Sequence, residues 1–275
     1  MLTAQNPKKP MEQPKTSVSR KHIIILLASA GLILALVSAA ALLQSPPQTP
    51  HFSLTAGIID QLGAEIPNPA FVNTITTILN DGGFNVTYHN KTLNVAFFKN
   101  LGKYNYGIII LRAHAALRDD GSTVDLFTSE PYSDTAHTAD QDNGLLVKGV
   151  LNYSDVQKAY FAITTKFIES LEGQFPRSIV IAMGCNTLDR DLEQMAKAFH
   201  KKGAEAFIGW NGYVGNLHTD EQTVTLLNGL LANNETIGQA VDGTEWDMTY
   251  GSRMACYPET ARNLRVSDLS SNTTA

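Results

Sequence analysis

Short apolar runs alternate with amphipathic segments along the chain from residue 52 onward. Apolar runs predict buried strands at 54–61, 84–89, 106–112, 178–183 and 204–209. Helical spacing of apolar residues predicts helices at 69–80, 95–101, 191–202, 220–232 and 237–241. Strands that alternate with helices are typical of a mostly parallel sheet covered on both faces. The pattern therefore predicts the α/β class, as a three-layer α/β/α sandwich.

The stretch 115–153 breaks this alternation. It is rich in Asp, Ser, Thr and Gly, and we expect a loop or hairpin there. Ser154 is a suitable N-cap for a helix that continues to about Glu172. The polar tail 264–275 is expected to be flexible.

An apolar segment without charges, Ile23–Leu43, precedes the predicted domain. A helix of that length rises about 31 Å, enough to cross a bilayer core. Basic residues lie only on its N-terminal side, so the positive-inside rule places that side in the cytoplasm. We expect a single-pass anchor in the cell membrane with an extracytoplasmic domain. A cleaved signal peptide is the alternative, and it also exports the domain.

These features divide the chain into five expected parts. Residues 1–21 form a disordered cytoplasmic tail, 22–43 the transmembrane anchor and 44–51 a proline-rich linker. The folded domain spans 52–263, followed by the flexible tail.

Charge and glycosylation signals agree with an exported domain. Residues 1–43 carry a formal charge of +4 and the remainder −9, which argues against a nucleic-acid partner. The Asn-x-Ser/Thr triplets downstream of the anchor are compatible with a glycoprotein. They begin at Asn85, Asn90, Asn152, Asn234 and Asn272.

A histidine and a cysteine each follow a predicted strand. His114 comes after the third run and Cys185 after the fourth. Carboxyl ends of parallel strands meet at one edge of a sheet, so we expect both side chains there. An imidazole can activate a neighbouring thiol as a nucleophile, and a helix starting near residue 190 would lower the thiol pKa further. Backbone amides of Ala115 and Cys185 are candidate oxyanion donors.

Structural alternatives exist for each candidate residue. His114 fits a rim histidine, and Cys185 fits a small buried apolar residue or a disulfide partner of Cys256. The acidic loop containing Glu130 and Asp140 fits a solvated surface better than a metal site, and we expect no metal or cofactor.

The order of these elements resembles the caspase-like superfamily of cysteine peptidases, particularly its CHAT and gingipain-like domains. The resemblance rests on a strand ending in His114, a polar excursion, and a strand ending in Ala-Met-Gly-Cys185. It continues through Cys185-Asn186-Thr187, a helix with Met195–Phe199, and the segment Gly203–Trp210, and covers about residues 54–242.

The resemblance implies roles for several residues. His114 would be the general acid/base, Cys185 the nucleophile, and the amide of Ala115 an oxyanion donor. Most members have Gly where this chain has Ala115. Trp210 and Asn211 occupy positions that often line the primary specificity pocket.

The sequence therefore predicts a membrane-anchored, extracytoplasmic cysteine endopeptidase that acts on a peptide or protein substrate through a thioester. A catalytically silent caspase-like domain that binds partners or serves as a scaffold at the cell surface is the alternative. An amidase with the same dyad is a third.

Overall fold

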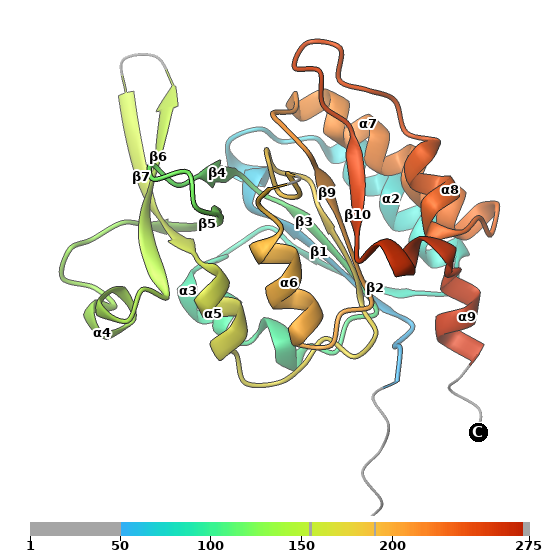
Figure 1. Ribbon diagram of the computed structural model, residues 1–275, viewed down its shortest axis with the longest axis horizontal. Coiled ribbons are helices and arrows are strands. Elements are labelled where there is room, and N and C mark those ends of the chain that lie inside the picture. The colour runs from blue at the N-terminus through green and yellow to red at the C-terminus, as the bar shows by residue number, and fades with distance from the viewer. Residues whose placement is uncertain (1–50, 154–155, 190, 272–275) are drawn as a thin grey trace, which may run out of the picture. The chain divides into compact units, whose positions relative to one another are not determined.

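A six-stranded sheet lies between two layers of helices in the computed structural model, which describes residues 51–153, 156–189 and 191–271 (Figure 1). The strand order is β10-β9-β8-β3-β1-β2, and only β10 is antiparallel to its neighbour. The strands are β1 (Thr55–Asp60), β2 (Asn85–His89), β3 (Ile108–Arg112), β8 (Ile179–Ala182), β9 (Ala206–Trp210) and β10 (Met254–Tyr257). The predicted α/β class with a mostly parallel sheet is confirmed. β10 was not expected; its first residue, Met254, is buried and the three that follow are half-buried.

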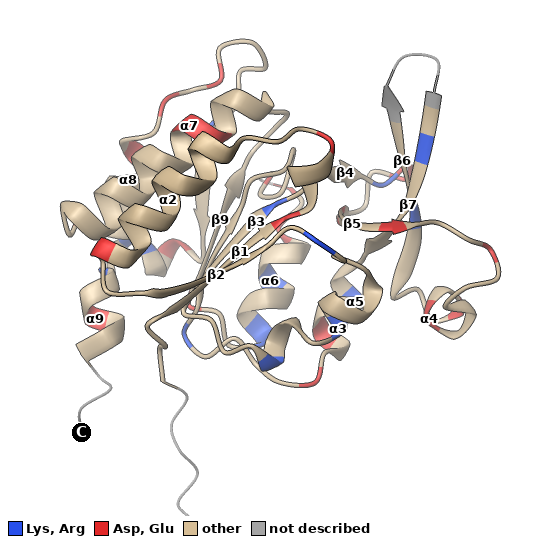
Figure 2. Ribbon diagram, turned by 180° about the vertical axis from the view of Figure 1, so that it is seen from behind, with Lys and Arg blue, Asp and Glu red and all other residues tan. Residues whose placement is uncertain are grey.

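Alternating side chains of the central strands enter two separate cores. Ile58 and Ile110 face one core, while their neighbours Ile59 and Ile109 face the other. The first core is covered by α2 (Pro69–Asp81), α7 (Asn216–Leu227), α8 (Ile237–Asp242) and α9 (Val266–Ser271). The second is covered by α3 (Val95–Lys99), α5 (Thr165–Ser170) and α6 (Gln194–Lys201). Figure 2 shows α2 and α7 in front of the sheet.

A separate antiparallel sheet follows β3. Its order is β4-β5-β7-β6, built from β4 (Ala115–Leu117), β5 (Val124–Pro131), β6 (Leu146–Tyr153) and β7 (Val156–Ile163), with α4 (Thr138–Asp142) between β5 and β6. Of the helix predicted from Ser154 to Glu172, the described residues form only α5 (Thr165–Ser170), and Val156–Ile163 is a strand instead. The stretch before Thr164 alternates between faces, burying Phe161 and Ile163 against Leu146, and pairs with β6 as a strand.

The two ends of the chain differ from one another. The predicted tail, anchor and linker lie outside the described residues, apart from His51 in the linker. Among the residues that the structure does describe, no helix is long and apolar enough to cross a membrane. At the other end, the expected flexible tail instead contains α9, because Val266 and Leu269 are buried in the first core.

A buried ion network joins the carboxyl ends of β1 and β3 to α7. The Arg112 guanidinium is fully buried and donates to both carboxylate oxygens of Asp220, at 2.8 and 2.9 Å, and to Asp60 at 2.8 Å. It also donates to the carbonyl of Ile66. The Tyr88 hydroxyl donates to Asp60, and burial together with that carboxylate raises the pKa of Tyr88 to about 12. The network fixes the residues that immediately precede His114.

We expect Arg112→Leu to lower the free energy of unfolding by about 3–5 kcal/mol, because Asp60 and Asp220 would stay buried without their cation. Urea unfolding followed by circular dichroism measures the loss. The control is Lys201→Gln, which removes an exposed ion pair with Glu169 and should cost about 1 kcal/mol or less. Equal small losses in both variants would contradict a stabilising role for the network.

Candidate functional site

The pairing of β3 with β8 brings the two predicted residues to one edge of the sheet. The strands are parallel, with Leu111 opposite Ala182, and the amide of Met183 donates to the carbonyl of Leu111 at 3.0 Å. His114 and Cys185 follow directly after this last contact. Both therefore lie at the carboxyl edge, where parallel sheets place their ligands.

Gly184 makes the approach between these two segments unusually close. A Cβ at this position would lie 2.6 Å from the carbonyl oxygen of Ala113 and 2.8 Å from the Cβ of Ala115. Glycine is required here because a side chain would collide with these atoms. Without one, the backbone before Cys185 lies against Ala113 and Ala115, the residues on both sides of His114.

His114 is held by its main chain and by an aromatic ring. Its amide donates to the side-chain oxygen of Gln61 at 3.0 Å, and its carbonyl accepts from the amide of Phe127 at 2.9 Å. The imidazole contacts the Phe127 ring edge to face, with centroids 6.2 Å apart. Burial lowers the pKa of His114, Glu65 opposes this effect and Arg112 adds to it. At neutral pH the imidazole is therefore uncharged.

Glu65 lies beside the imidazole and was not predicted from the sequence. Its Oε1 accepts from Lys158 and from the Tyr160 hydroxyl, both at 2.8 Å. Its Oε2 is buried without a hydrogen-bond partner and lies 3.9 Å from Nε2 of His114. Burial alone would raise the pKa of Glu65, but Lys158 and Tyr160 lower it overall. An anionic oxygen thus faces the histidine.

Cys185 occupies a half-buried turn rather than a helix N-terminus. The expected helix begins at Gln194, so the predicted lowering of the thiol pKa by a helix start near residue 190 is wrong. The sulfur lies 3.8 Å from the carbonyl oxygen of Val214. Burial raises the pKa of the Cys185 thiol, and the carboxylate of Asp247 raises it further. Burial thus favours the neutral thiol of Cys185, as it favours the neutral imidazole of His114.

The two cysteines are free. Cys256 of β10 is opposite Ile208 of β9, which is opposite Ile181 of β8. Two strand spacings amount to about 9–10 Å, and Cys185 lies four residues beyond Ile181. A disulfide requires Cα atoms within about 7 Å, so the register excludes the Cys185–Cys256 bridge.

The antiparallel pairing of β4 determines where the amide of Ala115 points. Residues opposite one another alternate between hydrogen-bonded and non-hydrogen-bonded pairs. His114 is bonded to Phe127, and Arg118 is bonded to Thr123. Ala115 and Leu126 therefore form a non-hydrogen-bonded pair, and the N–H of Ala115 points away from β5. A Cβ on Gly184 would lie 3.0 Å from the nitrogen of Ala115, so this N–H adjoins the segment that carries Cys185.

The other two candidate residues have structural partners. Trp210 is fully buried, and its indole N–H donates to the Thr219 hydroxyl at 2.9 Å, so it has no exposed surface with which to contact a substrate. Packing in the core accounts for this residue. The Asn211 side chain accepts from the amide of Arg253 at 2.8 Å and borders a cavity of about 350 Å³ next to β10.

Exposed apolar side chains lie on two loops next to Cys185. Asp247 lies in the loop between α8 and β10. It accepts from the amide of Gly215 at 2.8 Å and so connects this loop to the loop after β9. The two loops and the first turn of α7 carry a set of exposed residues, here called the apolar rim: Tyr213, Leu217, Trp246, Met248 and Tyr250. The rings of Tyr213 and Tyr250 are 6.2 Å apart. This surface is suited to contact with apolar groups.

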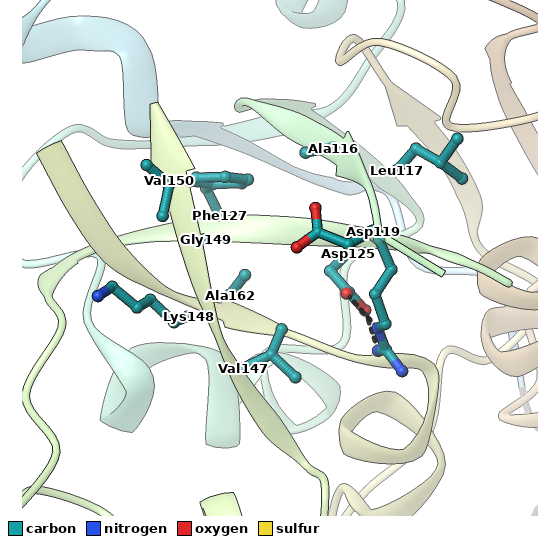
Figure 3. Close-up of a pocket in the computed structure, with 11 residues that line it drawn as sticks. Ala116, Leu117, Asp119, Asp125, Phe127, Val147, Lys148, Gly149, Val150 and Ala162 are labelled. Atoms are coloured by element: carbon teal, nitrogen blue, oxygen red, sulfur yellow. Dashed lines mark hydrogen bonds and ion pairs between the residues drawn. The ribbon is translucent and has the colours of Figure 1, made fainter. Parts of the chain in front are cut away.

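A cavity of about 340 Å³ lies over the antiparallel sheet (Figure 3). Its residues come from β4, β5, β6 and β7, and the Arg118–Asp125 ion pair lies on its wall. Phe127 forms part of the cavity and also contacts His114, so cavity and imidazole are adjacent. Gly149 is required where the Phe127 ring passes, since a Cβ there would lie 2.6 Å from the ring.

The remaining polar candidates have ordinary partners. Glu130 bonds to His137 at 2.7 Å, and Asp140 bonds to Lys99. No group of three His, Cys, Asp or Glu suited to a metal ion occurs within the described ranges. The described acceptor triplets begin at Asn85, Asn90 and Asn234, and all three asparagines are exposed.

The chain matches no protein-family model and no curated protein sequence.

We expect the alkylation rate of Cys185 by iodoacetamide to rise about tenfold per pH unit from pH 7 to beyond pH 9, because burial raises the thiol pKa. Mass spectrometry of the Cys256→Ser variant isolates the reaction at Cys185. The control is Cys185→Ser, in which Cys256 should be almost inert, because burial raises its pKa to about 12. A rate that is already constant below pH 7 would instead indicate a thiolate–imidazolium pair.

Proposed function

We propose that this protein is a cysteine endopeptidase of caspase-like fold, with Cys185 as nucleophile and His114 as general base and acid. The observation that supports it is the close approach of Gly184 to Ala113 and Ala115, which brings together the backbone segments that carry Cys185 and His114 at the carboxyl edge of the sheet. The three-layer arrangement and the order of histidine before cysteine agree with the resemblance found in the sequence.

The reaction would begin from neutral groups. The uncharged imidazole of His114 takes the proton of the Cys185 thiol while the sulfur attacks the peptide carbonyl. The carbonyl oxygen becomes an oxyanion, which the N–H groups of Ala115 and Cys185 stabilise. His114 then gives its proton to the departing amine, and a thioester remains on Cys185. Water, deprotonated by His114, hydrolyses the thioester and restores the thiol.

Glu65 would act as a positioning residue for His114. Its Oε2, which has no hydrogen-bond partner, faces Nε2 of the imidazole, so the carboxylate favours the tautomer with the proton on Nε2. The other nitrogen, Nδ1, is then the one that accepts the thiol proton. The carboxylate also stabilises the imidazolium that forms during the reaction.

The substrate would be a peptide or protein with apolar side chains. The apolar rim lies near Val214, whose carbonyl oxygen is 3.8 Å from the Cys185 sulfur, and near Asp247, whose charge acts on the thiol; it offers aromatic surface to such side chains. An extracytoplasmic location and attachment to the cell membrane by residues 22–43 remain part of the proposal, on the sequence alone.

A catalytically silent binding domain is the second candidate. The raised thiol pKa of Cys185 favours it, since little thiolate is present at neutral pH. Ala115 favours it as well, because its Cβ restricts the backbone where related domains have glycine.

We expect the full-length protein, purified in detergent, to cleave members of a peptide library, and Cys185→Ala and His114→Ala to lose at least about 1000-fold in kcat. Mass spectrometry of the products gives the rates. Cys256→Ser is the matched control and should retain full activity, since Cys256 lies away from the edge. Absence of cleavage by the wild type, or equal cleavage by Cys185→Ala, contradicts the proposed function and leaves the binding domain.

We expect Glu65→Gln to lower kcat by about tenfold or more while KM changes little. Activity requires neutral His114, and Glu65 raises the pKa of His114. Removal of the charge should therefore move the acid limb of the pH–rate profile to lower pH. Glu205→Gln, which removes an ion pair with Arg177 at the opposite sheet edge, is the control. An unshifted acid limb in Glu65→Gln would exclude the positioning role.

A further inference from the structure

The outer edge of β4 is free in the part of the chain that the structure describes. β4 is the first strand of the order β4-β5-β7-β6, so only one of its two edges is paired. The pairs His114–Phe127 and Arg118–Thr123 are hydrogen-bonded, which makes Ala116–Asp125 hydrogen-bonded too. The main-chain groups of Ala115 and Leu117 are consequently directed outward, away from β5.

The outward groups are spaced for an extended chain. Ala115 and Leu117 are two residues apart, and each presents one N–H and one C=O on the outer edge. The groups of Ala115 and those of Leu117 are therefore about 6.6–6.8 Å apart along the strand. This is the repeat of a β-strand, and an added strand would find a donor and an acceptor at both positions. Ala115 and Ala116 have small side chains, and Leu117 is 41% exposed.

The first of these outward groups is the oxyanion donor of the proposed reaction. The N–H of Ala115 adjoins Gly184, the residue before Cys185, so in the proposed reaction a carbonyl bound there would be the one that the sulfur attacks. The outward main-chain groups of Leu117 therefore lie on the same strand edge as the proposed oxyanion donor, Ala115. This continuity identifies the occupant of the edge as the substrate chain itself.

We propose that a peptide substrate binds as an additional strand on the free edge of β4, pairing with the main chain of Ala115 and Leu117. The inference rests on the proposed function and specifies its substrate as an extended, unfolded segment rather than a helix or a folded surface. Side chains of such a strand would alternate between the two faces of the antiparallel sheet. One face carries Ala116 and Phe127 and opens on the cavity of Figure 3.

The test is Leu117→Pro in the full-length protein. Proline removes the outward N–H of Leu117 and no bond to β5, and proline is tolerated on edge strands. We expect kcat/KM for cleavable decapeptides from a randomised library to fall about two- to tenfold, the effect of one lost main-chain hydrogen bond. An N-acetyl aminoacyl amide, too short to reach residue 117, should be cleaved as by the wild type. Leu117→Ala keeps the N–H and is the matched control.

Two further measurements keep the test independent of folding and of catalysis. N-methylation of each amide of a decapeptide should reveal one position, two residues from the cleaved residue, at which cleavage by the wild-type protein falls by a similar factor. In a Cys185→Ala background, decapeptides selected from the library should bind more weakly after Leu117→Pro.

The outcomes separate this inference from the proposed function. If cleavage is unaffected by Leu117→Pro and by N-methylation two residues from the cleaved residue, the added-strand inference is overturned and the proposed peptidase function stands. Binding that depends on Leu117, without cleavage by the wild type, supports the strand and overturns the peptidase. Neither cleavage nor Leu117-dependent binding overturns both.

Discussion

The parallel pairing of β3 with β8 determines the geometry of the whole candidate site. It ends with Leu111 opposite Ala182, and three residues after each partner the chain has placed His114 and Cys185 at the same edge. Gly184 then lets the two segments touch without a side chain between them. The buried ion pairs of Arg112 with Asp60 and Asp220 stabilise the carboxyl end of β3, next to His114.

The electrostatics of this edge favour uncharged partners. Burial penalises both the thiolate of Cys185 and the imidazolium of His114, and Asp247 adds to the penalty on the thiolate. Glu65 favours the imidazolium of His114, and backbone hydrogen bonds lower the pKa of the Cys185 thiol without outweighing its burial. In the proposed reaction, ionisation would wait until a proton moves from Cys185 to His114, and the carboxylate of Glu65 would then face the new positive charge. A thiol with a raised pKa has low reactivity at rest.

The sequence predicts the central sheet well because its strands are buried on both faces and appear as continuous apolar runs. The antiparallel sheet was missed because its strands do not appear as continuous apolar runs. Val124–Pro131 buries its first five residues but has Asp125 and Thr128 among them, and Val156–Ile163 lies within a stretch that was predicted as a helix. His114 and Cys185 were found from their place after apolar runs. Glu65 gave no such signal, since its approach to His114 depends on Lys158 and Tyr160, far along the chain.

The arrangement of β4 bears on how the site tolerates change. The groups that would hold a reacting carbonyl and its neighbours belong to the main chain of Ala115 and Leu117, and every residue except proline supplies them. Substitutions in β4 can therefore alter the size and charge around the substrate while they leave its attachment intact. Variation at these positions would tune preference between peptides, whereas Gly184, where any side chain collides with backbone, has almost no freedom to vary.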